Sequence, residues 1–404
     1  MPAQSNDALD AFLRPTAASA AALTVVAVPT FMLGAFGPSI KEELGFGETA
    51  FGAIFTIGFL ASAIGLQFAG VVADRRGPSP TLRAGIVVAG AGALAIAVLG
   101  RSYLAIVAFF CLIRIGESMV QPATNTLVSR VVPLGLQGRS VGIKQSAIPF
   151  STALAGFAVP LAGDTIGWEA TFGVVAACAL PVMLLVPPNP GVSESAPKPT
   201  ASASLRRLPH LRLLAVGGCF AAGSVITVSG FFTTAAEEAG YSSGEAGVLL
   251  GVGGLLLIVS RLSWGLAADR LAFDRFRVVA IAVGVGSIPY LLFATESRPL
   301  LVVGTIVVFG VGWSWPGLML LGLIELHPEA PGAASAVVQT AILVGALASP
   351  LAFGAVVDAY GFDVAWYLPF AFALIASALL SAGSVAARRY QVELSTTASR
   401  PLRA

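Results

Sequence analysis

The sequence is poor in charged residues. Asp, Glu, Lys and Arg make up 11% of the 404 residues, whereas ordinary soluble domains contain about 25%. A surface that faces water needs more charge than this, so the composition argues against a soluble enzyme. The net charge of +2 arises from charges dispersed between apolar runs, and it therefore offers no basic patch for a nucleic acid.

Cysteine and histidine are also scarce. The three cysteines, Cys111, Cys178 and Cys219, lie inside apolar segments, which fits neither a disulfide framework nor a spaced metal site. The two histidines, His210 and His327, have no ligand partners at useful spacing. No Gly-x-x-x-x-Gly-Lys-Ser/Thr run occurs, so a P-loop for ATP is absent. We expect no metal, no cofactor and no nucleotide.

Apolar residues are abundant, at 56% of the chain. A bilayer core of about 30 Å is crossed by about 20 apolar residues in a helix. Because residues 1–15 carry charges and no cleavage site, we read the first apolar run as a retained helix and not as a signal peptide. The sequence thus predicts an all-α membrane protein with twelve transmembrane helices. The predicted spans are 17–38, 49–72, 83–100, 103–129, 140–162, 170–187, 211–234, 246–268, 277–294, 299–324, 333–357 and 364–387.

A polar segment rich in proline and serine separates the sixth span from the seventh. We expect a tail at 1–15, a six-helix bundle at 16–187, a linker at 188–209, a second six-helix bundle at 210–390 and a tail at 391–404. Most basic residues fall in the tails and the even-numbered loops, and only Lys41, Arg101 and Arg298 fall in the odd-numbered loops. The positive-inside rule then places both termini in the cytoplasm, with the protein in the inner membrane.

The two halves repeat each other. Gly70-Val-Val-Ala-Asp74-Arg75 recurs 195 positions later as Gly265-Leu-Ala-Ala-Asp269-Arg270. Equivalent halves imply a repeat about an axis along the membrane normal, with a substrate held between the halves near the midplane. Four further matches recur at an offset of 194: Pro122 with Pro316, Gln145-Ser146 with Gln339-Thr340, Asp164 with Asp358, and Gly167 with Gly361.

These features resemble the major facilitator superfamily over roughly residues 16–390. Its best-known signature is Gly-x-x-x-Asp-Arg-x-Gly after the second helix, which reads here Gly70-Val-Val-Ala-Asp74-Arg75-Arg76-Gly77. The resemblance implies that the aspartate latches the cytoplasmic side shut, using a helix N-terminus and a basic residue, here Arg130 or Arg139. The second copy keeps Gly265, Asp269 and Arg270 but has Ala272 where Gly77 stands. The alternative is that these charges only mark cytoplasmic loops.

A narrower resemblance concerns the fourth predicted helix, Arg114-Ile-Gly-Glu117-Ser-Met-Val-Gln121-Pro122-Ala-Thr-Asn125, followed by Pro133. Its glutamate, proline and asparagine spacing is similar to that of the anion:cation symporters, which transport sugar acids and other organic anions. Gly167-Trp168-Glu169-Ala-Thr-Phe172 also resembles their Gly-Trp-Arg-x-x-Phe. Those proteins often have an arginine in the first helix, whereas residues 17–38 carry no charge. Other residues would therefore have to bind the anion.

Four ionisable residues lie well inside the predicted spans: Arg114, Glu117, Lys144 and Arg261. Such residues are functional candidates, because charge inside a membrane is costly. Arg114 and Glu117 are helical neighbours, and they form either a proton-coupling pair or a permanent structural ion pair. Lys144 either snorkels to the surface or binds a carboxylate. Arg261 resembles the helix 8 arginine of carboxylate transporters, with a structural ion pair as the alternative. Gln121, Asn125, Gln145 and Gln339 complete the predicted substrate-binding set.

Three functions remain open on the sequence. The leading one is proton-coupled import of a small organic anion by a monomer in the lipid bilayer, since three cations against one acid favour an anionic substrate. The second is proton-driven efflux of an amphipathic compound, although the fifth predicted helix lacks the Gly-Pro pair that resembles drug antiporters. The third is a non-transporting receptor, which the absence of a soluble signalling domain and the twelve-span repeat argue against.

Overall fold

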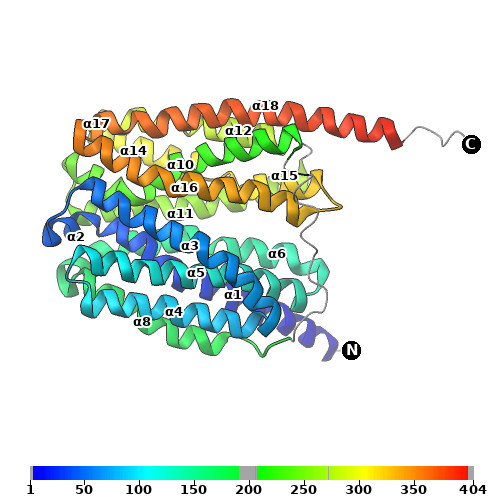
Figure 1. Cartoon of the computed structure of the whole chain (residues 1–404), viewed down its shortest axis with the longest axis horizontal. Helices are drawn as coiled ribbons and strands as arrows, with labels where there is room; N and C mark the ends of the chain where they lie inside the picture. The colour runs from blue at the N-terminus through cyan, green and yellow to red at the C-terminus, as the bar shows by residue number, and fades with distance from the viewer. Residues whose placement is uncertain (1–2, 191–204, 206, 272, 399–404) are drawn as a thin grey trace, which may run out of the picture. The chain divides into compact units, whose positions relative to one another are not determined.

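The computed structural model describes residues 3–190, 205, 207–271 and 273–398, which are helical without strands. Figure 1 shows their order along the chain. The helices are α1 (Ala3–Ala35), α2 (Gly37–Leu44), α3 (Glu48–Arg76), α4 (Pro78–Leu99), α5 (Tyr103–Val131), α6 (Leu134–Gln145), α7 (Ala147–Ala158), η1 (Val159–Gly163), α8 (Asp164–Leu185), α10 (Pro209–Glu238), α11 (Ser243–Arg270), α12 (Arg275–Val285), α13 (Ile288–Phe293), α14 (Arg298–Val307), η2 (Val308–Gly312), α15 (Pro316–Leu326), α16 (Pro331–Tyr360), α17 (Phe362–Ala365) and α18 (Tyr367–Ala398).

Twelve segments among the described residues are long and apolar enough to cross a membrane, which confirms the predicted number. Each predicted span overlaps one of them, and most start a few residues earlier than the sequence indicated. The first helix begins at Ala3, whereas its membrane-crossing segment is Ala11–Ala35. The short amphipathic helix α2, which follows it, was not predicted.

Prolines divide three of the spans into shorter helices. A proline has no N–H to donate to the carbonyl four residues earlier, and its ring crowds that carbonyl. Pro149 lies just after the break between α6 and α7, Pro289 after the break between α12 and α13, and Pro316 at the start of α15. The last break also contains the π-helical turn η2. These spans are therefore bent where proline removes a backbone hydrogen bond.

The chain forms two compact units. The first contains the described parts of Met1–Ala196, Val228–Ile258 and Pro350–Ala359, and the second those of Pro197–Thr227, Val259–Ser349 and Tyr360–Ala404. The division into two bundles at residues 188–209 stays a prediction.

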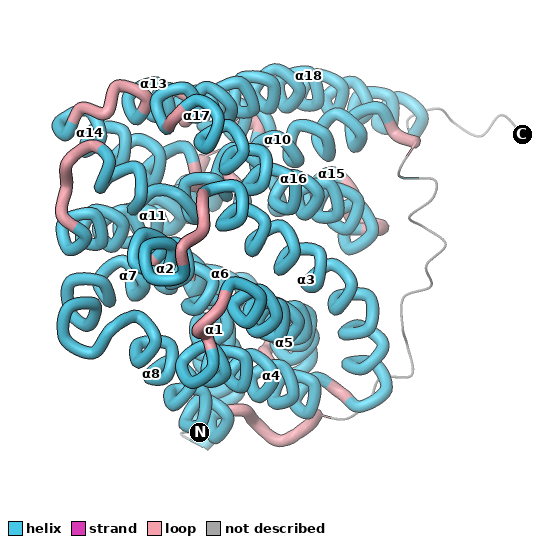
Figure 2. The backbone as a smooth tube through the Cα atoms, turned by 60° about the vertical axis from the view of Figure 1, so that its left-hand side comes forward, coloured by secondary structure: helices cyan, strands magenta, loops and turns pink. Residues whose placement is uncertain are grey.

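Within the first unit, α4 packs along α5, and α1 contacts α5, α7 and α8 (Figures 1 and 2). Lipid tails are as apolar as leucine, so close backbone approach, and not the hydrophobic effect, drives this packing. Gly85 on α4 and Gly116 on α5 face each other, and a Cβ on either would meet the backbone of the other helix. The buried side chains around them form the core of this unit, including Leu82, Ile86, Val120 and Leu127.

The second unit is held by similar contacts. Tyr290 on α13 is 1% exposed and donates to the carbonyl of Ser224 on α10 at 2.9 Å. A Cβ at Gly345 would overlap the carbonyl of Cys219, which brings α16 close to α10. His210 and His327 are also buried, with their Nε2 atoms 2.9 Å apart.

One end of the first unit carries α2, the start of α3, the end of α10 and the end of α16; we call it the α2 end. Backbones approach closely here, because a Cβ at Gly34 would meet Ser229 O, and one at Gly52 would meet Pro350 O. Phe231 on α10 packs against Phe51 on α3 at a centroid distance of 5.5 Å and against Phe353 on α16 at 4.8 Å. These rings and glycines close the α2 end.

Candidate functional site

A buried polar cluster lies in the first unit around Arg114 on α5. Arg114 is 6% exposed and forms an ion pair with Glu117, one helical turn further along. Its Nη1 also donates to the hydroxyl of Thr30 on α1 at 3.3 Å, and that hydroxyl donates to Glu117 at 3.4 Å. The guanidinium stacks over the ring of Phe59 on α3, 4.3 Å from its centroid. Three helices therefore hold one arginine and one carboxylate together.

This geometry allows a carboxylate to change partners. Glu117 is part-buried, with 19% of its side chain exposed, so water or a ligand can reach it. A ligand that competes for Arg114 would release Glu117 from this ion pair. Both interpretations of the pair, proton coupling and structural support, require the contact that the structure shows.

A second buried cation lies on α6. Lys144 is 1% exposed, and its ammonium donates to the side-chain oxygen of Asn125 and, at 3.3 Å, to the hydroxyl of Thr124. Both acceptors lie on α5 and are neutral. The side chain therefore does not snorkel to the surface, because α5 offers it two oxygens inside the protein. Lys144 and Asn125, predicted together from the sequence, are in direct contact.

The other predicted binding residues are distributed over both units. Gln121 is half-buried on α5 between Glu117 and Asn125, and Gln145 is half-buried beside Lys144. Arg261, half-buried on α11, and Gln339, exposed on α16, belong to the second unit. The substrate-binding role of all of these residues stays a prediction.

The predicted latch residues are described in part. Arg75 lies in the last turn of α3 and Arg270 ends α11, and both are exposed, as are Arg139 on α6 and Gly265 on α11. Gly77 joins α3 to α4 and is buried against Asn189, whose amide donates to the carbonyl of Arg76 at 3.0 Å. Gly70 and the side chains of Asp74 and Asp269 lie outside what the structure describes, as does Ala272. The latch is therefore untested.

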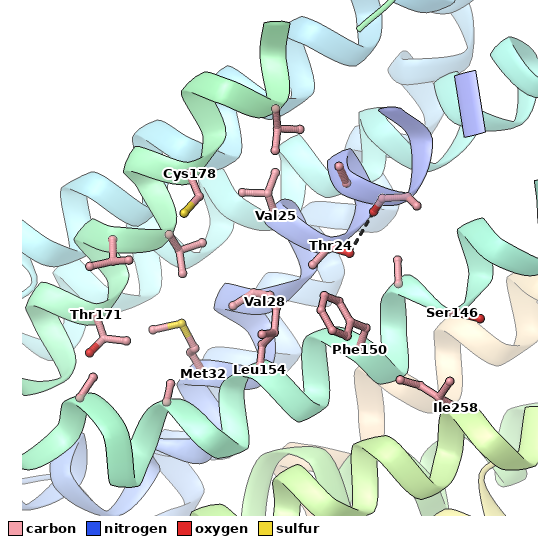
Figure 3. Close-up of a pocket in the computed structure, with 18 of the residues that line it drawn as sticks. Thr24, Val25, Val28, Met32, Ser146, Phe150, Leu154, Thr171, Cys178 and Ile258 are labelled. Carbon is pink, nitrogen blue, oxygen red and sulfur yellow. Dashed lines mark hydrogen bonds between the residues drawn. The ribbon is translucent and has the colours of Figure 1, made fainter. Parts of the chain in front are cut away.

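A groove of about 690 Å³ runs along α1, α7 and α8 in the first unit. Figure 3 shows Val28 and Met32 of α1 lying near Phe150 and Leu154 of α7. The hydroxyl of Thr24, which also lines the groove, is bonded to the carbonyl of Ala20 at 2.9 Å. The lining is therefore almost wholly apolar.

Sequence reasoning missed Thr30 and Phe59, which hold Arg114. Thr30 carries a hydroxyl group, follows Pro29 and lies in a span without charge. This polar side chain was the feature of the sequence that could have indicated a site residue. Phe59 gave no signal, because phenylalanine is common in every apolar run. Lys41 was predicted only as a loop charge, yet it is 9% exposed, paired with Glu48, and donates to Thr234 at 3.0 Å. The pKa of Lys41 is lowered by burial, against the opposing effect of Glu48.

Comparison with known proteins places the chain in a family. An "MFS-type efflux pump" of Mycolicibacterium smegmatis is 29% identical over 338 residues, covering 76% of each chain. The "Gallate transporter" of Pseudomonas putida is 27% identical over 205 residues, covering 49% of this chain and 43% of that protein. A crystal structure of the nucleoside transporter NupG has a TM-score of 0.71 at 14% identity, covering 93% of this chain and 99% of that one. Residues 19–341 match the family model of the Major Facilitator Superfamily. With twelve membrane-spanning helices and this match, the chain belongs to the Major Facilitator Superfamily of membrane transporters.

Proposed function

We propose that the protein is a secondary transporter that moves a small organic anion across the membrane by alternating access, in symport with protons. The observation that carries this proposal is Lys144. Its ammonium is 1% exposed, and its partners among the described residues are the neutral oxygens of Thr124 and Asn125. A buried charge is costly without a counter-charge, and an ammonium has three donors. A substrate carboxylate would supply the missing negative charge.

The Arg114–Glu117 pair would couple this anion to protons. An anion drawn to Arg114 competes with Glu117, whose carboxylate then takes up a proton because burial disfavours its unpaired charge. Release of the anion restores the ion pair and expels the proton. A single part-buried carboxylate is too few ligands for a sodium site without many other oxygens, whereas a proton needs only one.

Two further features fit this function. The gallate transporter among the relatives is named for a carboxylate substrate. The distribution of basic residues favours an orientation with both termini in the cytoplasm, which suits a protein of the inner membrane. In that orientation the latch of Asp74, Arg75 and Arg139 lies on the cytoplasmic side and the α2 end on the outer side. A reporter fused after Arg403 would then be active only if it is a cytoplasmic one.

Efflux of an amphipathic compound is the second candidate. The apolar groove along α1, α7 and α8 favours it, since a wide apolar surface suits such a compound. The efflux pump of M. smegmatis also aligns over more of this chain than the gallate transporter does. This function would need neither Lys144 nor an excess of buried cations.

Proteoliposomes separate the two candidates. Purified protein is assayed for uptake of a panel of labelled carboxylates, with and without an inward proton gradient, and for counter-gradient movement of cationic dyes. We expect a carboxylate to accumulate only with the gradient, and Lys144→Gln to weaken its binding by about 10- to 100-fold, as loss of hydrogen bonds to a charged group does. Arg101→Gln, which removes an exposed positive charge, should change little. Dye transport that is unaffected by Lys144→Gln, without carboxylate uptake, would establish efflux instead.

A further inference from the structure

Helix α3 begins without a capping side chain of its own. Its N-cap residue is Gly47, which has no side chain to accept a hydrogen bond from the first turn. Asp358, near the end of α16, does this instead. The backbone N–H of Glu48 donates to its Oδ1 at 3.0 Å, and that of Thr49 donates to its Oδ2 at 2.8 Å. One carboxylate thus satisfies two N–H groups of a helix 310 positions earlier in the chain.

The equivalent helix in the second half caps itself. At the offset of 195, Gly47 corresponds to Ser242, which precedes α11. The N–H of Glu245 donates to Ser242 Oγ at 3.3 Å, and the N–H of Ser242 donates to the Glu245 carboxylate at 2.8 Å. This reciprocal arrangement is a capping box. The start of α11 is therefore capped by residues of its own first turn, whereas the start of α3 is capped by Asp358 on α16.

The Asp358 contact lies where the α2 end is closed. Gly354, one turn before it on α16, leaves no room for a Cβ beside the carbonyl of Glu48. Lys41 on α2 pairs with Glu48 and donates to Thr234 on α10 at 3.0 Å. Separation of α3 from α16 would break the Asp358 hydrogen bonds and uncover the packing around Phe231.

We propose that Asp358 is the latch of the outer gate, holding the α2 end closed by capping α3 from α16. This inference rests on the proposed alternating access, in which the α2 end must open to admit substrate. A carboxylate at a helix N-terminus is favoured both by the hydrogen bonds and by the helix dipole. When α3 and α16 part, water replaces the carboxylate at the first turn of α3. The contact of Asp358 with α3 therefore stabilises the closed state and is absent from the open state.

The test separates latching from simple capping. The reporter is Ser229→Cys on α10, a position 7% exposed beside Gly34 at the α2 end, with Cys111, Cys178 and Cys219 replaced by serine. Its labelling by a membrane-impermeant maleimide is timed in intact cells and in inverted vesicles. The main variant is Gly47→Ser/Asp358→Ala, which gives α3 a cap of its own, as Ser242 does for α11, while removing the contact with α16. The reporter protein with Gly47 and Asp358 intact is the reference, and Glu245→Ala, which breaks the capping box of α11 and leaves Asp358 in place, is the matched control.

We expect the double variant to be labelled about fivefold faster than the reference in intact cells, because its closed state is no longer favoured over its open state by one cap of about 1 kcal/mol. Glu245→Ala should be labelled at the reference rate. Equal rates in the double variant and in the reference would show that Asp358 only caps α3, and would overturn the proposal. Because labelling needs no substrate, this result is independent of whether the cargo is an anion.

Discussion

Lys144 on α6 donates from its ammonium to the side-chain oxygen of Asn125 on α5. The lysine is buried, while the asparagine is exposed to the space beside α5. The ammonium of Lys144 is therefore paired with a neutral side chain and not with a carboxylate.

Asn125→Asp should place a permanent counter-charge on Lys144. We expect the variant to fold with an unchanged or higher melting temperature, because a buried cation gains a charge-assisted partner. Binding of the transported carboxylate should weaken by about tenfold or more, since the new carboxylate competes for the same ammonium. Binding is measured by equilibrium titration with a labelled carboxylate in detergent. Asn125→Ser, which stays neutral, is the control, and full affinity in Asn125→Asp would remove Lys144 from the binding site.

Glu117→Gln should uncouple transport from protons. Glutamine mimics the protonated carboxyl, so Arg114 loses its ion-pair partner and the side chain no longer binds or releases a proton. We expect gradient-driven accumulation to fall to the equilibrium level, while exchange of labelled for unlabelled substrate continues. Both are measured in proteoliposomes.

Glu169→Gln serves as the comparison for Glu117→Gln, because it removes a half-buried carboxylate on α8 and should leave accumulation intact. If Glu117→Gln still accumulates substrate against its gradient when driven by pH, the pair with Arg114 is a structural one.

Asp274 should make stability depend on pH. Burial alone would raise the pKa of this carboxyl, but hydrogen bonds from Ser384, from the N–H of Arg277 and from Arg388 outweigh it and lower the pKa below its usual value. A carboxyl with a lowered pKa stabilises the folded state above its unfolded pKa, and this stabilisation is lost as pH falls through the folded value.

Asp274→Asn should therefore lower the melting temperature at pH 7 by about 1–4 °C, as loss of a helix cap does in proteins of this size range. The difference from the wild-type protein should begin to shrink as pH falls below about 4, where the carboxyl of the unfolded chain becomes protonated, and should be smallest below the lowered pKa of the folded carboxyl. Thermal unfolding of both proteins in detergent, between about pH 7 and pH 3, measures this difference in melting temperature. Asp363→Asn, at an exposed position, provides the baseline, and a pH-independent difference would contradict the charge-based cap.

Gly361→Ala should destabilise the protein through its backbone. Gly361 has φ 88° and ψ 170°, and its repeat partner Gly167 has φ 80° and ψ 166°. This region is essentially restricted to glycine, and forcing another residue into it costs about 1–3 kcal/mol. We expect a melting temperature lowered by several degrees. Gly138→Ala, at an exposed position of α6 with nothing within 4 Å of the added Cβ, should be neutral or slightly stabilising.

The membrane spans could be predicted from the sequence because a run of about twenty apolar residues is the length that crosses the bilayer core as a helix. Helix α2 could not, since eight residues with mixed polarity are too short for a periodic signal. The match of Gly167 with Gly361 was visible as an offset, and the shared backbone conformation explains why both positions are glycine.

The sequence indicated which charged residues belong to the candidate site, but not which side chains they contact. A charge within a span is conspicuous, so Arg114, Glu117 and Lys144 were found. The partners of these charged side chains depend on how the neighbouring helices are rotated about their axes, and the sequence carries little information about this rotation. Thr30 and Phe59 meet Arg114 because α1 and α3 present those faces to α5, and Asp358 reaches α3 across 310 positions.

The dependence of α3 on Asp358 also bears on how the protein is made. When the second span enters the membrane, the ribosome has still to synthesise most of the chain before Asp358 emerges. During that time the N–H groups of Glu48 and Thr49 have only water or lipid headgroups as acceptors. The eleventh span then brings the aspartate to them, so this contact of the α2 end forms among the last steps of folding. The helix of the second half carries Ser242 and Glu245 at its own start, so this capping box can form as soon as that helix does.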